Sequence, residues 1–398
     1  MKVLFVCPFV PWPLVNGGKI RTFHLLRTAS AEAEIHLRMI AEPEPTPGAA
    51  EALAPWCKSL GFFPRSRPGR IERWKLPKLA RWFHSRALLA AVHADLARGG
   101  FRLVHLDELL LARIVPPERS VPVVQHHHKL DTVLYGSLAQ NSTVANVATL
   151  SRRFDLWKLR RLEAESARRY RHHLLCSQGD ADTLRTRYGA LDCAVVPSGF
   201  DPQSFQPEPS LGAREPERLM FLGSMDYGPN VEAVRHFVGA ILPRIQRERP
   251  AARLEIVGAD PLPEVRALAG TSVQLSGRVE RVQPYLQRAS ALVVPLLIGG
   301  GTRLKIVEAL ALGTPVVSTT IGAQGLGLEH GRHLFLADGE AEFAAATLRI
   351  LADPLEAARM GERGRLHVHE HFRWDVLGRE LVDYWERVAF SGALSPSR

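Results

Sequence analysis

Short runs of apolar residues alternate along the chain with longer segments in which apolar residues recur at helical spacing. The runs lie at 2–6, 102–106, 121–125, 219–223, 253–258, 291–296 and 314–319. Because apolar strands separated by helices are typical of parallel sheets covered on both faces, this pattern predicts an α/β architecture. The series is interrupted once, by a segment at 200–217 that is rich in proline and charge. We therefore expect two α/β domains.

The length of the chain agrees with this division. Its 398 residues suit two domains of roughly 100–200 residues each. The interruption places an N-terminal domain at 1–205 and a C-terminal domain at 206–373. The last segment, 374–390, has apolar residues at helical spacing and predicts one further helix.

Composition narrows the class of protein. Hydrophobic residues make up 46% and charged residues 23% of the chain, which excludes a disordered or fibrous protein. The four cysteines form no CxxC pair, so we expect neither a zinc site nor a disulfide framework, and a cytoplasmic location. The first apolar run is broken by prolines and is interpreted as a strand, not a signal peptide. No stretch approaches the ~18 apolar residues that a membrane-spanning helix needs.

Positive charge is concentrated in the first half of the chain. The formal net charge is +10, and the segment from Leu60 to His172 carries 21 Lys or Arg against 9 Asp or Glu. Such a surplus is typical of proteins that bind nucleic acid, an anionic membrane surface or a phosphorylated ligand. Within it, 70–92 interleaves tryptophans with cations, and Pro77 starts or kinks its helix. This segment either lies in a membrane interface or packs its aromatic rings into the first domain.

The strongest chemical motif lies between Pro295 and Leu326. A strand leads into Gly299, Gly300 and Gly301, and the helix that follows carries Arg303 and Lys305 in its first turn and then Glu308. Glycines leave backbone N–H groups open at a helix start, and cations there favour a bound anion. A glutamate one turn later is placed to accept hydrogen bonds from ribose. The motif predicts a nucleoside diphosphate site, with a glycine-rich turn before a solvated helix as the alternative.

A second glycine pair, Gly17 and Gly18, follows the first strand and precedes a helix expected near Ile20. It favours an approaching phosphate, although a simple turn gives the same pattern. The chain contains neither GxGxxG nor GxxxxGK[ST], which disfavours a nicotinamide cofactor and a P-loop.

Three histidines, at 126–128, end the strand near 121–125. Successive side chains of an extended chain point to alternate faces, so they cannot all bind one ion. We therefore favour His128 as a residue of the functional cleft over a metal site. The acidic DAD triplet at 180–182 is interpreted as a helix cap, not as a metal ligand set.

The segment 295–326 resembles the donor-binding signature of the retaining group 1 glycosyltransferases, of the family 4 type. Further similarity lies at Val195–Phe205, Leu219–Phe237 and Gly277–Pro295. The resemblance implies a GT-B fold, with two Rossmann-like domains facing a cleft and the final helix packed on the first domain. The chain departs from the family pattern at Gly300, which stands where typical members carry the first of two glutamates. Ser224 and Asn230 also stand at or near positions where many members carry an arginine and a lysine.

The resemblance also implies roles for individual residues. Arg303 and Lys305, with the N–H groups of Gly17, Gly18 and Gly301, would stabilise the departing diphosphate, and His128 would contact the sugar or the acceptor. The remaining donor-binding residues would be Glu308 at the ribose, Val279 at the base, and Gly223, Gly300 and Thr302 around the phosphates.

Together these inferences predict a metal-independent transferase without a cofactor. Its donor would be a UDP- or GDP-linked sugar, and its acceptor a glycan, a lipid-linked or another hydroxyl compound. It would act in synthesis of bacterial surface polysaccharide, such as exopolysaccharide, or of glycoconjugates. The basic half would bind an anionic acceptor or the inner face of the cell membrane, where the enzyme would be a peripheral protein. We do not expect it to bind nucleic acid. The alternatives are a GT-B sugar-nucleotide epimerase, a basic nucleic-acid-binding protein and an inactive nucleotide-binding module.

Overall fold

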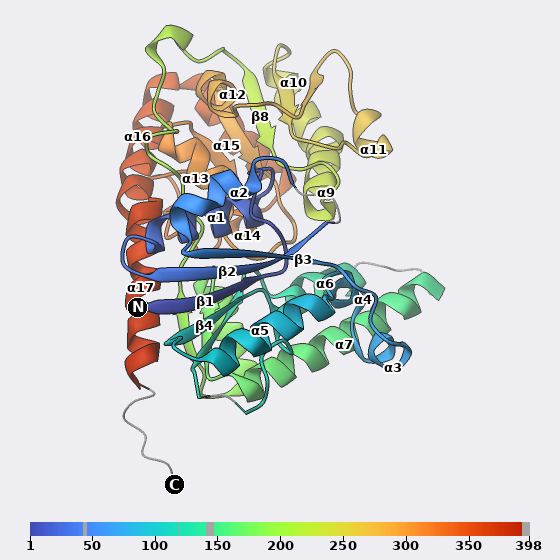
Figure 1. Ribbon diagram of the computed structural model, residues 1–398. Helices are drawn as coiled ribbons and strands as arrows, with labels where there is room; N and C mark the ends of the chain where they lie inside the picture. Colours follow the sequence, from blue (N-terminus) through green and yellow to red (C-terminus); the bar gives the residue numbers. More distant parts are fainter. Residues whose placement is uncertain (43–45, 119, 141–146, 392–398) are drawn as a thin grey trace. The chain divides into compact units, whose positions relative to one another are not determined.

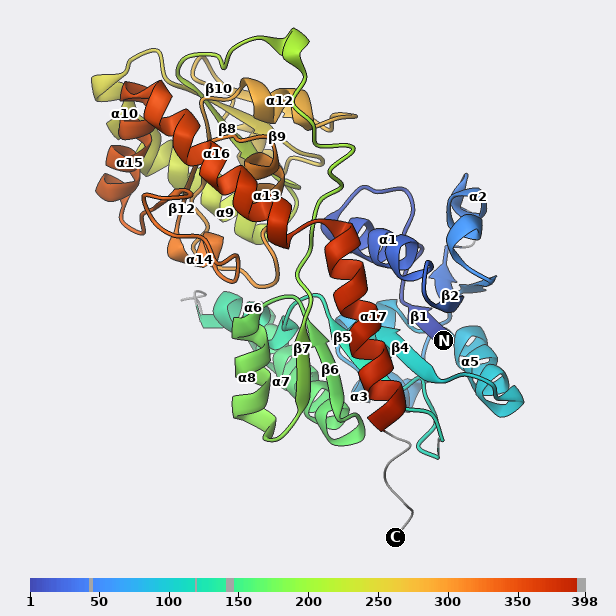
Figure 2. The ribbon, with the colours of Figure 1, turned by 90° about the vertical axis from the view of Figure 1, so that its left-hand side faces the viewer.

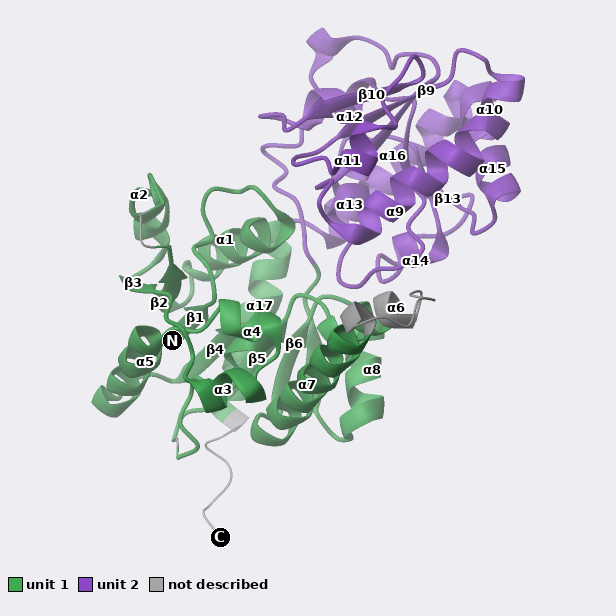
Figure 3. Cartoon of the chain, turned by 90° about the vertical axis from the view of Figure 1, so that its right-hand side faces the viewer, with its two compact units in different colours: residues 1–197, 374–398 green, residues 198–373 purple. Residues whose placement is uncertain are grey.

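The computed structural model describes residues 1–42, 46–118, 120–140 and 147–391, which form two compact units. Unit 1 consists of Met1–Pro197 and Trp374–Arg398, and unit 2 of Ser198–Arg373 (Figure 3). Each contains one parallel sheet with helices packed on it, which confirms the predicted α/β class. The change of unit falls at Ser198 instead of residue 206, because Phe200 and Phe205 are buried in the core of unit 2.

Unit 1 is built on a seven-stranded sheet in the order β3-β2-β1-β4-β5-β6-β7 (Figure 1). The strands are β1 (Lys2–Cys7), β2 (Glu34–Ala41), β3 (Ser59–Pro64), β4 (Leu103–Asp107), β5 (Val123–His127), β6 (His172–Leu175) and β7 (Asp192–Val195). The helices are α1 (Gly17–Ala29), α2 (Ala49–Leu53), α3 (Arg70–Lys75), α4 (Lys78–Trp82), α5 (Arg86–Arg98), α6 (Asp131–Gln140), α7 (Val147–Arg169), α8 (Gln178–Tyr188) and α17 (Trp374–Ser391).

The two faces of this sheet are covered by different helices. Val3 and Phe5 of β1 face the core that contains α1 and α17, and the alternate residues Leu4 and Val6 face the core that contains α4 and α5. The last helix, α17, lies beside α1 (Figure 2). At their contact a Cβ on Gly378 would lie 2.1 Å from Thr28 Oγ1, so only glycine permits this approach.

The basic aromatic segment is broken into short helices. Pro77 caps α4 after α3 has ended at Lys75, and Leu76 and Ala80 are buried beneath them. Trp74 and Trp82 are 73% and 63% exposed. Of the two alternatives for this segment, packing of the aromatic rings into the first domain is therefore wrong for these two rings. No helix in the described part of the chain is both long and apolar enough to cross a bilayer.

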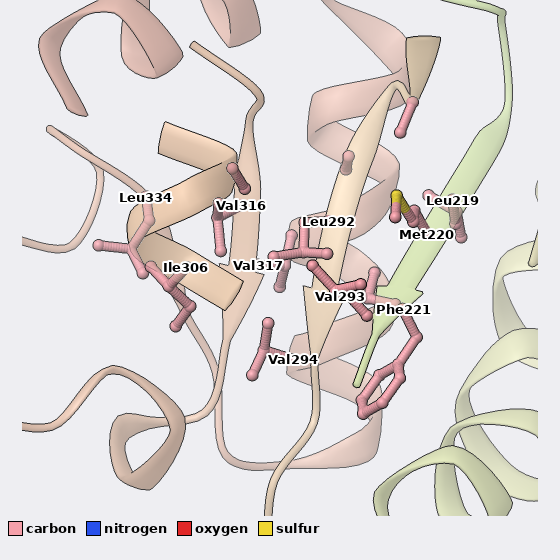
Figure 4. Close-up of a cluster of buried hydrophobic side chains, with 14 of the residues drawn as sticks. Leu219, Met220, Phe221, Leu292, Val293, Val294, Ile306, Val316, Val317 and Leu334 are labelled. Carbon is pink, nitrogen blue, oxygen red and sulfur yellow. The ribbon is translucent and has the colours of Figure 1, made fainter. Parts of the chain in front are cut away.

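Unit 2 is built on a six-stranded sheet in the order β10-β9-β8-β11-β12-β13. Its strands are β8 (Arg218–Leu222), β9 (Arg253–Val257), β10 (Val273–Gly277), β11 (Ala291–Val294), β12 (Val316–Ser318) and β13 (Phe335–Leu336). Its helices are α9 (Gly228–His236), α10 (Leu242–Glu248), α11 (Pro263–Arg266), α12 (Gln283–Arg288), α13 (Leu304–Ala311), α14 (Thr320–Ala323), α15 (Glu340–Ala352) and α16 (Pro354–His371). Side chains of β8, β11, β12 and α13 meet in its core (Figure 4).

Strand order changes direction at one point in each sheet. In unit 1 this point lies between β1 and β4, and in unit 2 between β8 and β11. Ligands of open parallel sheets bind outside the carboxyl ends of the strands at such a point. The loops that follow these four strands therefore carry most of the candidate site residues, whereas His128 follows β5 and Val279 follows β10.

Candidate functional site

The glycine-rich loop of unit 2 joins β11 to α13 and is tied by Arg303. One terminal nitrogen of its guanidinium, Nη1, donates to the carbonyls of Gly300 and Gly301, both at 2.5 Å, and Nη2 donates to the Ile321 carbonyl at 3.3 Å. Gly301 has φ +69°, which glycine adopts without strain. Arg303 is the residue before α13 and not part of its first turn, which corrects the sequence-based placement. Its guanidinium therefore fixes the shape of the loop.

Lys305 is placed at the start of α13 by three neighbours. Its Nζ donates to Asn230 Oδ1 at 2.8 Å and lies 4.2 Å from the centroid of the Phe221 ring. A Cβ on Gly223 would lie 3.0 Å from the same Nζ and 2.6 Å from Asn230 Nδ2, so glycine makes room for both side chains. Burial and the charge of Arg303 lower the pKa of Lys305 to about 7. The ammonium is thus poised to gain stability from an arriving anion.

Glu308 lies one turn beyond Lys305 and is half-buried. Burial raises the pKa of its carboxyl to about 8, against the opposing charge of Lys305. No hydrogen bond or ion pair joins this carboxyl to another residue in the described ranges. A carboxyl without a partner in the protein can accept hydrogen bonds from a ligand that brings its own donors, such as a vicinal diol.

We refer to Gly223, Asn230, Lys305 and Glu308 as the Lys305 cluster. The other donor-binding candidates of unit 2 lie around it with separate contacts. Thr302 Oγ1 accepts the backbone N–H of Ser198 at 2.8 Å. Val279 follows β10 and packs partly buried against the core of unit 2. Asn230 also donates to the Ser224 carbonyl at 2.9 Å, so it links that turn to Lys305.

In unit 1 the register of two strands brings acid and imidazole together. Asp107 of β4 pairs with His126 of β5. Residues two apart in a strand share a face, so His126 and His128 both reach Asp107 Oδ1, each at 2.7 Å. The intervening His127 points the other way and lies 3.1 Å from His173. Asp107 Oδ2 accepts from Thr22 Oγ1 at 2.7 Å.

His128 is held between two carboxylates. Its Nε2 contacts Asp107, and its Nδ1 lies 3.3 Å from Glu108 Oε1. Burial lowers the pKa of His128, but the charges of Asp107 and Glu108 outweigh it and raise the pKa above its ordinary value. Burial also raises the pKa of Asp107, but the charge of His128 and hydrogen bonds from both imidazoles hold it well below its usual range. Both shifts favour the ion pair of a protonated His128 with an ionised Asp107.

Glu108 has a strained backbone. Its φ is 108° with ψ 143°, a region that residues other than glycine rarely adopt. The residue is 8% exposed, and its Oε2 is buried without a hydrogen-bond partner among the described residues. Strain of this kind persists where the surrounding structure imposes it, and it is concentrated at functional sites.

The glycine pair of unit 1 lies beside this group. Gly17 and Gly18 are the first two residues of α1, which begins earlier than the expected Ile20 because Asn16 caps it through the Lys19 N–H at 3.0 Å. A Cβ on Gly18 would lie 3.4 Å from His128 Nδ1. The start of α1, Asp107, Glu108 and His128 therefore form one group, which we call the Asp107 cluster.

Ligand atoms of His105, Asp107 and His126 lie close enough together to hold a metal ion. However, Arg21 directs Nε and Nη2 at His126 Nε2, at 3.1 and 3.0 Å. A guanidinium only donates, so this nitrogen accepts and the proton of His126 lies on Nδ1, facing Asp107. His105 Nδ1 in turn accepts from Trp385 Nε1 at 3.1 Å. These hydrogen bonds, with a fixed positive charge beside them, do not fit a cation site.

Sequence reasoning missed Asp107, Glu108 and Arg21. The available signal was the acidic pair that directly follows the strand at 102–106, one strand away from the histidines. The DAD triplet also needs a correction, since Ser177 caps α8 by accepting the Asp180 N–H at 3.2 Å. Asp180 itself lies in the first turn.

Two family models match the chain, one in each half. Residues 15–204 match the Glycosyltransferase Family 4 model, and residues 216–353 match the model for glycosyl transferases group 1. A phosphatidyl-myo-inositol mannosyltransferase of Mycolicibacterium smegmatis is 29% identical over 210 residues, which cover 50% of this chain and 53% of that protein. The chain thus matches about half the length of this curated relative.

Solved structures resemble the whole chain. Sucrose-phosphate synthase from Thermosynechococcus elongatus superposes with a TM-score of 0.72 at 19% identity, covering 98% of this chain and all of that one. HepE from Anabaena, solved in complex with UDP and glucose, superposes with a TM-score of 0.68 at 16% identity over 97% of this chain and 99% of its own. At these identities the likeness concerns the fold.

Proposed function

Because the chain belongs to the group 1, family 4 type of glycosyltransferases with the GT-B fold, we propose that it transfers a sugar from a nucleoside diphosphate sugar to a hydroxyl acceptor. The observation that carries this proposal is the Lys305 cluster. It combines a half-buried ammonium, fixed by Asn230, with a carboxyl of raised pKa one turn away. A diphosphate and a ribose diol are the ligands that satisfy both groups.

Within this proposal Lys305 binds the diphosphate, and Glu308 accepts hydrogen bonds from the ribose hydroxyls. Arg303 donates hydrogen bonds to two carbonyls of the loop and so maintains the conformation of the loop. Preorganised donors aimed at the oxygen where charge develops lower such barriers by ~3–4 kcal/mol each. Val279 flanks the base, and Gly300 and Thr302 lie with the loop around the phosphates.

The Asp107 cluster supplies the second half of the chemistry. We assign His128 to the transferred sugar or the acceptor, with Asp107 and Glu108 holding it charged, and the N–H groups of Gly17 and Gly18 to the departing oxygens. The bond between the anomeric carbon and the diphosphate oxygen breaks as the acceptor oxygen bonds to that carbon. The acceptor proton passes to the leaving phosphate on the same face, so the anomeric configuration is retained. No metal ion takes part.

The donor is UDP- or GDP-linked. Support for UDP comes from the Anabaena neighbour, which was solved with UDP. The mannosyltransferase relative, whose name gives a phosphatidyl-myo-inositol substrate, bears on the acceptor. By analogy the acceptor here is a glycan or a lipid-linked hydroxyl compound of the bacterial surface, such as an exopolysaccharide precursor. The enzyme acts in the cytoplasm, at an anionic membrane surface.

Thermal shift with UDP, GDP and ADP tests the nucleotide site first. One of them should raise the Tm, and Glu308→Gln should abolish that shift. Turnover of the matching sugar nucleotides with lipid-linked acceptors, in the presence of EDTA, tests the reaction, and NMR of the product gives its anomeric configuration. Hydrolysis or epimerisation of the donor without an acceptor, or no shift with any nucleoside diphosphate, would overturn the proposal.

A further inference from the structure

Unit 1 contains a cavity outside both clusters, between the short helices α3 and α4 and the first half of α7. These helices lie side by side (Figures 1 and 3) and are joined where Lys78 N–H donates to Asp155 Oδ1 at 2.8 Å and Lys78 Nζ to Ser151 Oγ at 3.0 Å. The cavity measures about 410 Å³. It is lined by Arg70, Arg73, Trp74, Lys78, Arg81, Ser151, Phe154, Asp155 and Lys158, which we call the α3–α7 pocket.

The lining of this pocket is strongly cationic. Five of its residues are lysine or arginine, and a single carboxylate, Asp155, opposes them. Asp155 Oδ1 is engaged by the Lys78 N–H, and Arg81 Nε donates to the Leu76 carbonyl at 3.0 Å. Like charges gathered around one cavity repel one another unless an anion lies among them.

Lys158 makes the strongest case for an anion. The residue is 4% exposed, and its ammonium lies 4.5 Å from the centroid of the Phe154 ring and 5.9 Å from that of Trp74. In the described part of the chain no hydrogen bond or ion pair satisfies it. Burial, together with the charges of Arg81 and Lys78, lowers its pKa. An ammonium that has only ring faces beside it, on a residue this little exposed, gains an oxygen partner when an anion binds in the pocket.

Exposed apolar side chains lie next to the lining residues in the sequence of α3, α4 and α7, and Trp74 is itself part of the lining. Ile71, Trp74, Trp82, Leu150 and Trp157 are all more than half exposed. Aliphatic and indole groups beside cations are the composition that lies in the boundary between lipid headgroups and acyl chains. The rings are also already paired, with Phe154 stacked on Trp157 at 5.7 Å and edge-on to Trp74 at 6.1 Å. Rings paired in this way favour a lipid over a stacked nucleic acid base.

We propose that the α3–α7 pocket binds the phosphate of an anionic phospholipid, while Ile71, Trp74 and Leu150 enter the bilayer interface around it. The inference rests on the proposed function only in naming the membrane as the place where the acceptor is met. Phosphate binding in the pocket needs neither donor nor acceptor.

Co-sedimentation of the full chain with vesicles tests the proposal. Vesicles of phosphatidylcholine with 30% phosphatidylglycerol should bind the protein at least tenfold more tightly than phosphatidylcholine alone. Arg70→Gln/Arg73→Gln should weaken this binding ~25-fold, because a cation near an anionic surface contributes about fivefold. The matched control Arg235→Gln/Arg247→Gln removes the same charge from exposed positions of unit 2 and should leave binding within twofold.

Two further variants separate the pocket from its surroundings. Lys158→Met removes the ammonium at similar side-chain volume, and Trp74→Ala removes an exposed ring. Each should weaken binding at least fivefold. Equal binding to neutral vesicles, an equal loss in the control pair, or tighter binding of single-stranded RNA than of vesicles would overturn the proposal. The nucleotide thermal shift should survive in all variants. Its absence in the unaltered protein would count against the proposed function alone.

Discussion

His128 Nε2 lies 2.7 Å from Asp107 Oδ1, although 20 residues separate the two in the chain. The distance is set by the parallel pairing of β4 and β5. Because Glu108 follows Asp107 directly, the same pairing places a second carboxylate 3.3 Å from the other nitrogen of the imidazole. The imidazole of His128 is thereby fixed between two carboxyl groups at the carboxyl edge of the sheet of unit 1.

Replacing Asp107 should lower the pKa of this imidazole. In Asp107→Asn the neighbouring charge is gone, so the basic limb of the pH profile of kcat/KM should move to lower pH and kcat should fall ~10-fold or more. Nucleotide binding in unit 2 should persist. A profile unchanged in position would show that Asp107 does not act through His128.

The same pair predicts how stability depends on pH. The raised pKa of His128 contributes stability that is present below its unfolded value of about 6.5 and is lost as pH rises through the folded value. The lowered pKa of Asp107 contributes stability that is present above about 3.9 and is lost as pH falls. Urea denaturation from pH 2 to 9 should therefore show a decline in stability at both ends of the range. In His128→Gln the decline at the alkaline end should be absent.

Lys305→Met should stabilise the protein while impairing its function. Between about pH 7 and 10.5 the unfolded chain holds a proton that folded Lys305 has lost, so this residue makes stability rise with pH. At pH 6 the variant, which carries no buried charge, should have the higher Tm. The donor KM should rise, or kcat fall, ~100-fold. A lower Tm at pH 6 together with normal kinetics would contradict both roles.

Glu308→Gln should have the opposite pH signature. Between about 4.5 and about 8 folded Glu308 holds a proton that the unfolded chain has lost, so stability falls as pH rises through this window. The stability of the glutamine variant does not fall in this window. Its Tm should therefore equal that of the unaltered protein at pH 4 and exceed it at pH 9. Calorimetry at these two values measures the difference. Loss of the nucleotide thermal shift in the same variant tests the ribose contact.

Arg303→Ala should lower both stability and activity. The guanidinium donates to three backbone carbonyls, and leaving buried acceptors unsatisfied costs ~1–3 kcal/mol. We expect a lower Tm without nucleotide and a weaker nucleotide shift. An unchanged Tm with a ~100-fold loss in kcat would instead indicate that Arg303 acts on the diphosphate alone, as the sequence first indicated.

The fold and the pair Lys305 and Glu308 were accessible from sequence for a local reason. Apolar strands have their own composition, and Lys305 and Glu308 are separated by less than one turn of a single helix. The Asp107 cluster depends on strand order and register, which no local pattern encodes. The direction of the Arg303 side chain and the strain at Glu108 likewise arise from tertiary contacts. The strand β2 carries alternating polar residues inside a buried sheet, and its periodicity therefore gave no clear prediction.

The return of the chain to unit 1 affects the order of its folding. Trp374, Leu381 and Trp385 of α17 are buried in the core of unit 1, and the Trp385 indole holds His105 beneath the Asp107 cluster. During synthesis these side chains emerge only after all of unit 2. Unit 2 is contiguous and can close as soon as Arg373 has left the ribosome, whereas the earlier-made sheet of unit 1 still lacks α17 on the face that α1 covers only in part. The half of the protein that is translated first is thus the half that matures last.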